Sequence, residues 1–207
     1  MEYMRSCKDN QFDLAIIDPP YGLERYKKAD GGNSKKIKSF GDKDKNWNNI
    51  RPTDDYFRHL FRISKNQIIW GANNFDLPLS EYFIVWDKKQ MMPSFARCEL
   101  AWTNIKVPAK IFEGRTVEKN RVKIHPTQKP ITLYKWLLKN YAKPDDKIFD
   151  SHVGSGSIRI ACHDMGFDFT GCEIDKDYYE DQEKRFKNHC QQGDLFSGTD
   201  LQELIYE

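Results

Sequence analysis

Residues 147–173 read KIFDSHVGSGSIRIACHDMGFDFTGCE, and this stretch decides the fold. It predicts a strand over 147–150, a turn of small residues over 152–157, a helix to about Met165 and a second strand over 169–173. A strand, a crossover helix and another strand in this order are typical of a parallel β-sheet. The stretch therefore predicts an α/β fold.

The segments outside this stretch continue the alternation of strands and helices. Residues 13–18, DLAIID, form an apolar run that ends in an acid, which is typical of a strand buried on both faces of a parallel sheet. Other strands are predicted at 67–70, 82–86 and 99–103, and other helices at 53–64, 132–141 and 176–190. We therefore expect a doubly wound, mostly parallel sheet in a single domain over 1–207, with ligands bound beyond the carboxyl ends of the strands.

Composition narrows the class of protein. The 207 residues carry a net charge of +2, and no apolar run approaches the roughly 20 residues that a membrane helix needs. The polar first ten residues do not resemble a secretory signal. The five cysteines are scattered without a CxxC pair, so we expect a reducing, cytoplasmic setting and no bound metal.

Two stretches of the chain are rich in basic residues, 25–45 and 106–129. Loops of this kind can neutralise the phosphates of a nucleic acid. Either stretch, taken alone, is explained equally well as a solvated surface loop.

The turn at 152–157 is a candidate ligand site. Glycines between a strand and a helix let backbone N–H groups approach a ligand, and the helix N-terminus favours negative charge. Glu173 follows Asp150 at the distance where an acid holds a ribose diol in nucleoside-binding α/β units. Together they favour a nucleoside cofactor without separating NAD from S-adenosylmethionine, whereas the turn alone is also consistent with an ordinary strand-to-helix connection.

Asp18-Pro19-Pro20-Tyr21 directly follows the first buried strand. The two prolines stiffen the backbone and remove two N–H donors. The Asp18 carboxylate and the Pro19 carbonyl are left as acceptors beside an aromatic ring. This arrangement suits an amino group on a flat molecule.

These residues resemble the signature of the DNA amino-methyltransferases, (Asp/Asn/Ser)-Pro-Pro-(Tyr/Phe/Trp). His125-Pro-Thr-Gln-Lys-Pro130 is similar to a segment that lines the methionine end of the cofactor pocket in that family. Residues 150–157 resemble its glycine turn, with Ser151 and His152 as departures, and 171–179 resemble its ribose-binding strand and helix. The catalytic segment precedes the cofactor turn, as in the β group, whose fold is a circularly permuted form of the Rossmann-like S-adenosylmethionine-dependent methyltransferase fold. That family usually has a further strand and helix before the catalytic strand, so one sheet element is expected to be missing or displaced.

The resemblance implies transfer of a methyl group from S-adenosylmethionine to the N6 amino group of a flipped adenine in double-stranded DNA, with S-adenosylhomocysteine as product. It assigns catalysis to Asp18, Pro19, Pro20 and Tyr21. It assigns cofactor contacts to Asp18, His125, Pro126, Gln128, Lys129, Asp150, His152, Gly154, Ser155, Gly156, Ser157, Glu173, Ile174 and Asp175. Target recognition is expected in an insert at about 88–121, where the candidate DNA contacts are Lys88, Lys89, Arg97, Lys106, Lys110 and Arg115, although such residues are more often merely solvated. The loop 22–46 could close over the flipped base.

Several alternatives stay open. An N4-cytosine enzyme would use the same acceptors, but aspartate in the first position of the signature favours adenine. A catalytically inactive DNA-binding relative, an RNA or protein-glutamine methyltransferase and a nicotinamide oxidoreductase explain fewer of the motifs. A homodimer and an accompanying restriction enzyme are both compatible with the sequence.

Overall fold

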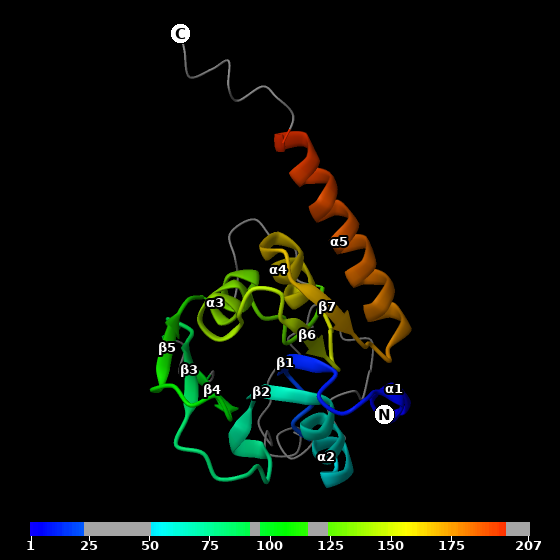
Figure 1. Ribbon diagram of the computed structural model, residues 1–207. Coiled ribbons are helices and arrows are strands. Elements are labelled where there is room, and N and C mark those ends of the chain that lie inside the picture. The colour runs from blue at the N-terminus through cyan, green and yellow to red at the C-terminus, as the bar shows by residue number, and fades with distance from the viewer. Residues whose placement is uncertain (23–50, 92–95, 116–123, 198–207) are drawn as a thin grey trace, which may run out of the picture.

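A computed structural model describes residues 1–22, 51–91, 96–115 and 124–197 (Figure 1). Seven strands form one sheet in the order β5-β3-β4-β2-β1-β6-β7. Their bounds are β1 Phe12–Ile17, β2 Ser64–Trp70, β3 Phe83–Asp87, β4 Cys98–Thr103, β5 Lys110–Glu113, β6 Lys147–Asp150 and β7 Asp168–Gly171. The helices are α1 Glu2–Ser6, α2 Asp54–Ile63, the short 3-10 helix η2 Ala72–Asn74, α3 Ile131–Tyr141, α4 Ser157–Met165 and α5 Lys176–Ser197.

The sheet is mostly parallel, as predicted. The central strand β1 pairs in parallel with β2 on one side and β6 on the other, and β7 pairs in parallel with β6. Only β4 runs against its neighbours: it is antiparallel to β2 and to β3, whereas β5 is parallel to β3. The carboxyl ends of β1, β2, β6 and β7 therefore lie at the same edge of the sheet.

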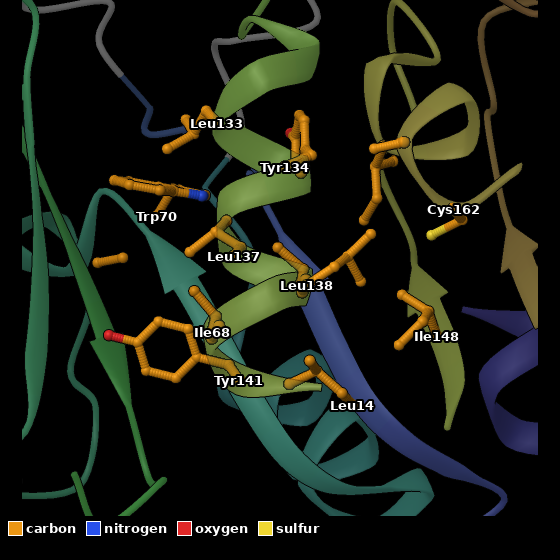
Figure 2. Close-up of a cluster of buried hydrophobic side chains, with 14 of the residues drawn as sticks. Leu14, Ile68, Trp70, Leu133, Tyr134, Leu137, Leu138, Tyr141, Ile148 and Cys162 are labelled. Carbon is orange, nitrogen blue, oxygen red and sulfur yellow. The ribbon is translucent and has the colours of Figure 1, made fainter. Parts of the chain in front are cut away.

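Helices cover both faces of the sheet because every central strand is apolar on both sides. On β1, Leu14 and Ile16 belong to the core under α3 and α4, whereas Ala15 and Ile17 belong to the core under α1 and α2. Figure 2 shows the first core, in which Leu137 and Leu138 of α3 lie over the strands. The doubly wound arrangement is the one that the sequence predicts.

The predicted and observed elements differ at several ends. β2 begins at Ser64, three residues before the predicted strand, because α2 passes into it without a loop. β7 ends at Gly171, so Glu173 lies in the loop beyond the strand, and α5 continues to Ser197 rather than to residue 190.

The expected insert at 88–121 includes two strands of the sheet, β4 and β5. β5 was not predicted, because it is an edge strand whose side chains alternate in exposure and whose Ile111 is 62% exposed. The described part of the insert outside these strands is confined to loop residues 88–91, 96–97, 104–109 and 114–115. Among the described residues, no helix is both long enough and apolar enough to span a membrane.

Candidate active site

A cavity of about 330 Å³ opens at the carboxyl ends of β1 and β6. It brings the predicted catalytic residues Asp18 and Pro20 together with many of the predicted cofactor residues. Those that line it are His125, Gln128, Lys129, His152, Gly154, Ser155, Glu173, Ile174 and Asp175. The strand order explains this meeting, because β1 and β6 are parallel neighbours although the sequence between them is long.

Six predicted site residues do not line the cavity: Pro19, Tyr21, Pro126, Asp150, Gly156 and Ser157. Asp150 is buried at the end of β6, where its Oδ1 accepts the His152 N–H at 2.8 Å. Burial raises the pKa of the Asp150 carboxyl to about 8. Asp150 thus does not face the cavity; its buried carboxylate holds the start of the turn through this hydrogen bond.

The glycine turn uses its backbone donors mainly within the protein. The Gly154 N–H donates to Glu173 Oε2 at 2.8 Å, and the Asp175 N–H donates to Glu173 Oε1 at 2.9 Å. The Val153 N–H donates to the Cys172 carbonyl at 3.1 Å. These bonds fix the Glu173 carboxylate at the rim of the cavity, and each of its oxygens retains a lone pair for a ligand hydroxyl. The sequence-based expectation that the turn's N–H groups point at a ligand does not apply to the Val153 and Gly154 donors.

Gly154 and Gly156 are needed for the shape of this turn. Their φ angles are 51° and 72°, in the left-handed region that residues with a Cβ rarely adopt. Gly156 is also the residue from which α4 starts, and Ser157 is buried in its first turn.

Both oxygens of the Asp18 carboxylate have partners. The Tyr21 hydroxyl donates to Oδ1 at 2.5 Å, and the Lys129 ammonium forms an ion pair with Oδ2. Burial and the nearby Asp18 charge raise the pKa of Tyr21, so its hydroxyl stays protonated and remains a donor.

The Tyr21 ring lies on the backbone of β2's end rather than on the cavity wall. It packs edge-on against Phe75, with the ring centroids 6.0 Å apart, and covers Gly71. A Cβ at Gly71 would lie 2.2 Å from the Tyr21 ring. The positive φ of 69° at Gly71 further restricts this position to glycine.

Sequence reasoning missed Glu99, which joins the site from β4. Glu99 Oε2 lies 3.2 Å from Lys129 Nζ, and Lys88 Nζ lies 2.5 Å from Glu99 Oε1. Burial opposes the charge on Glu99, but Lys129 and Lys88 outweigh it and lower the pKa of Glu99. Likewise, Asp18 and Glu99 outweigh the burial of Lys129 and raise its pKa. A single acid within an apolar strand, CELAWT, is the only sequence signal that points to this residue.

Four further residues line the cavity without having been assigned to it individually: Thr127, Tyr134, Val153 and Tyr178. Tyr134 lies in the first turn of α3 and is buried. The helical pattern of α3 marks it as a core residue, and its second role at the cavity follows only from where the helix begins.

The two departures from the family's glycine turn form a hydrogen-bonded group with a residue of α2. The hydroxyls of Tyr56 and Ser151 are 2.6 Å apart, and Ser151 Oγ lies 2.9 Å from His152 Nδ1. Burial lowers the pKa of His152 to about 4, so its imidazole is neutral at physiological pH. Tyr56 of α2 thus contacts both Ser151 and His152 and helps to hold this part of the turn in place.

Three of the predicted DNA contacts have partners inside the protein. Lys88 pairs with Glu99, Lys89 pairs with Asp87 and Glu113, and Lys110 donates to Asn140. The other three, Arg97, Lys106 and Arg115, are exposed. The loop expected to close over a base falls mainly on residues 23–50, outside the described residues.

Cysteine and histidine side chains of α4 and α5 come together only in part. Cys162 is buried in the core, His163 Nε2 lies 3.6 Å from Cys190 Sγ, and His189 pairs with Asp164 at 2.6 Å. Across the described ranges, no group of three or more histidine, cysteine or acidic side chains is arranged to hold a metal ion.

Comparison with known proteins gives a consistent family. The profile of the DNA methylase family matches residues 85–184. Type II methyltransferase M.HpaI of Haemophilus parainfluenzae is 35% identical over 81 residues, which cover 38% of this chain and 26% of that protein. Type II methyltransferase M2.DpnII of Streptococcus pneumoniae is 27% identical over 141 residues, which cover 68% of this chain and 49% of that protein. The chain thus spans half or less of the length of these relatives.

Solved structures show the same fold. The M1.HpyAVI–SAM complex matches with a TM-score of 0.54 and 21% identity, over 88% of this chain and 92% of that one. The cytosine-N4-specific PvuII DNA methyltransferase matches with a TM-score of 0.58 and 13% identity, over 88% of this chain and 82% of that one. Taken with the order of the four motifs, the family match and the two relatives support a DNA amino-methyltransferase of the N6-adenine or N4-cytosine type. The solved structures share the mostly parallel α/β fold of this chain.

Proposed function

We propose that this chain transfers a methyl group from S-adenosylmethionine to the exocyclic N6 amino group of adenine in double-stranded DNA. One observation carries the proposal: Asp18 of the Asp-Pro-Pro-Tyr segment shares a cavity with Gly154 of the glycine turn and with Glu173. The proposed acceptor of the amino group, Asp18, and the proposed binding group for a nucleoside, Glu173, therefore face the same cavity.

The lining residues fit S-adenosylmethionine. The carboxylates of Glu173 and Asp175 face the cavity, and the charges of Asp18 and Lys129 offset each other in an ion pair, so the site favours a cationic ligand. The neutral imidazole of His152 adds no repulsion to a sulfonium. The cofactor, when bound, supplies an electrophilic methyl group.

Individual contacts follow from the geometry of the rim. Glu173 is held by two backbone N–H groups in a position to accept hydrogen bonds from ribose hydroxyls. Ile174 is fully exposed beside it and offers apolar surface to a purine ring. His125, Gln128 and the rest of the 125–129 segment would surround the methionine end.

The chemistry depends on the amino nitrogen of adenine, whose lone pair is delocalised into the ring. The Asp18 carboxylate, which lines the cavity, would accept one of its hydrogens and localise the lone pair for attack on the methyl carbon. The Pro19 carbonyl, which is bonded to Pro20 of the lining, is the proposed acceptor of the other hydrogen once the base is bound. The new N–C bond forms as the C–S bond breaks, the sulfur keeps the electron pair, and one amino proton leaves through Asp18 to solvent. The Oδ1 atom that accepts the Tyr21 hydroxyl has a second lone pair, so the amino group can share it or replace the tyrosine.

The substrate base must leave the duplex to reach this cavity, at a cost of a few kcal/mol. Stacking on an aromatic ring would recover roughly 1–3 kcal/mol, and Tyr21 is the proposed platform, which requires its ring to turn from Gly71 toward the base. The exposed Arg97 and Arg115 are the proposed phosphate contacts of the recognition segment 88–121. Lys106 lies near Lys65 at the opposite edge of the sheet from the cavity and is not proposed as one.

The test is incubation of the protein with methyl-labelled S-adenosylmethionine and mixed-sequence DNA, followed by digestion to nucleosides. We expect the label in N6-methyladenine. Label in N4-methylcytosine would identify the alternative N4-cytosine enzyme. Cofactor binding without any labelled nucleoside would identify an inactive relative.

A further inference from the structure

Four charged side chains form a row that starts at Asp18 and runs away from the cavity. Asp18, Lys129, Glu99 and Lys88 alternate in sign, and each forms an ion pair with the next. We call them the ion-pair row. Only Asp18 and Lys129 belong to the recognised motifs, so the row extends the site by two residues from the region of β3 and β4.

The Lys129 ammonium has three neighbours. It forms ion pairs with Asp18 and, at 3.2 Å, with Glu99, and it lies over the Trp70 ring, 5.5 Å from its centroid. The side chain is only 3% exposed, so water is not available to take over any of these roles. An ammonium held on three sides in this way has little freedom to move.

The position of this ammonium decides which Asp18 oxygen a substrate can use. With a single carboxylate partner, a buried ammonium would settle between both carboxylate oxygens, because this maximises the Coulomb attraction. The Glu99 carboxylate, 3.2 Å from the ammonium, competes with Asp18 for it, and the ammonium pairs with Oδ2 of Asp18. Oδ1 then remains the atom that accepts a hydroxyl now and an amino group during the reaction.

We propose that Glu99 is a positioning residue for methyl transfer, which holds Lys129 on one oxygen of Asp18 and leaves the other to the amino group of the substrate. This inference rests on the proposed function. Lys88 completes the row: it offsets the charge of Glu99 and lies over the Trp86 ring, 5.3 Å from its centroid. Removing the Glu99 charge therefore changes the catalytic acceptor without touching the cofactor or the base.

The first experiment compares Glu99→Gln with the matched control Asp164→Asn. Asp164 is a carboxylate of similar exposure, 19% against 23%, which also pairs with a lysine but lies on α4 away from the cavity. In Glu99→Gln we expect kcat to fall by about 10- to 100-fold while the Kd of the cofactor and the KM for DNA change by less than about threefold. Asp164→Asn should leave all of these constants unchanged. An unchanged kcat in Glu99→Gln, or a loss confined to KM, overturns the proposal.

A double-mutant cycle then separates positioning from a structural role. If Glu99 acts through Lys129, adding Glu99→Gln to Lys129→Met should lower kcat no further. Losses that multiply would show that Glu99 acts by another route and would overturn the proposal. Folding of each variant is checked by circular dichroism, and Glu99→Asp, which keeps the charge, should recover part of the activity.

A readout independent of methylation distinguishes failure of this inference from failure of the proposed function. The ammonium signal of the buried Lys129 can be followed by NMR after labelling with 15N-lysine. It should shift or broaden in Glu99→Gln and stay unchanged in Asp164→Asn. If the wild-type protein labels no DNA, the proposed function fails, but a Lys129 signal that changes in Glu99→Gln still supports the inference that Glu99 positions Lys129. A Lys129 signal that is the same in Glu99→Gln and in the wild type overturns that inference.

Discussion

The two ends of the cavity are built in different ways. At the cofactor end, the contacts join residues close in sequence: Gly154 to Glu173, and Val153 to Cys172. At the amino-group end, Asp18 is surrounded by Lys129 from before α3, Glu99 from β4 and Tyr21 resting on Gly71 after β2. One end is thus a local motif, whereas the other is assembled by the sheet from distant segments.

The difference has a physical basis. A strand–turn–helix–strand unit forms its own hydrogen bonds, so its sequence carries most of its shape. An acceptor for an amino group needs charges placed around it from several directions, which requires side chains from several strands. Substitutions at the first end should therefore affect cofactor affinity, and substitutions at the second should affect the rate of transfer.

Asp18→Ala should produce the largest effect. It removes the main acceptor and leaves Lys129 with one carboxylate partner fewer. We expect methyl transfer to fall by about 10³-fold, with the Kd of the cofactor within about threefold of the wild-type value. Single-turnover kinetics and calorimetric titration measure the two quantities, and equal transfer rates would refute the role of Asp18.

Glu173→Gln should have the opposite effect to Asp18→Ala: it should weaken cofactor binding and leave the rate of transfer nearly unchanged. The amide has one acceptor oxygen instead of two, so it cannot bind both backbone N–H groups and a ribose diol. We expect the cofactor to bind about 100-fold more weakly, a loss in the range of a charged hydrogen bond, while kcat at saturation changes little. Glu180→Gln removes the charge of an exposed acid on α5; it is the control and should bind the cofactor normally.

Gly71→Ala should test the support of Tyr21. The added Cβ would meet the Tyr21 ring and displace its hydroxyl from Asp18. We expect kcat to fall by roughly 10-fold because a misplaced group at the reaction centre is costly. Gly166→Ala is a matched control with a φ of 75° and no atom within 4 Å of the new Cβ. It bears the left-handed strain, about 1–2 kcal/mol, without the steric clash, and should keep its kcat.

His152→Phe should have the smallest effect, visible mainly as a change in pH dependence. The folded-state pKa of His152 is lowered to about 4, below its ordinary value of 6.5. The folded state therefore resists protonation, and the stability that His152 contributes at neutral pH is lost as the pH falls from 6.5 toward 4. In urea unfolding, the free energy of His152→Phe should decline less steeply over this interval. Parallel curves for the two proteins would contradict the assignment.

The elements and contacts at the cofactor end of the cavity were predicted from the sequence more completely than those at the amino-group end. The strand at 147–150, the turn and the helix to Met165 lie where predicted, because apolar runs and glycines report local backbone geometry directly. β5 was missed because an edge strand lacks a continuous apolar pattern. Lys88, Lys89 and Lys110 were predicted as DNA contacts from their charge alone, and the sequence did not indicate the carboxylates and the amide with which they interact inside the protein.

By itself, the sequence determined the α/β class, the order of the motifs, and the identity of Asp18 and Glu173 as the chief polar groups of the cavity. These follow from residue types and from short-range spacing. Only the tertiary structure decided that Glu99 and Lys88 extend the site, that Gly71 carries Tyr21, and that Tyr56 supports His152. The reason is the order of the strands: β4 is inserted between β3 and β2, so an acid from an antiparallel strand comes to lie beside a lysine far along the chain.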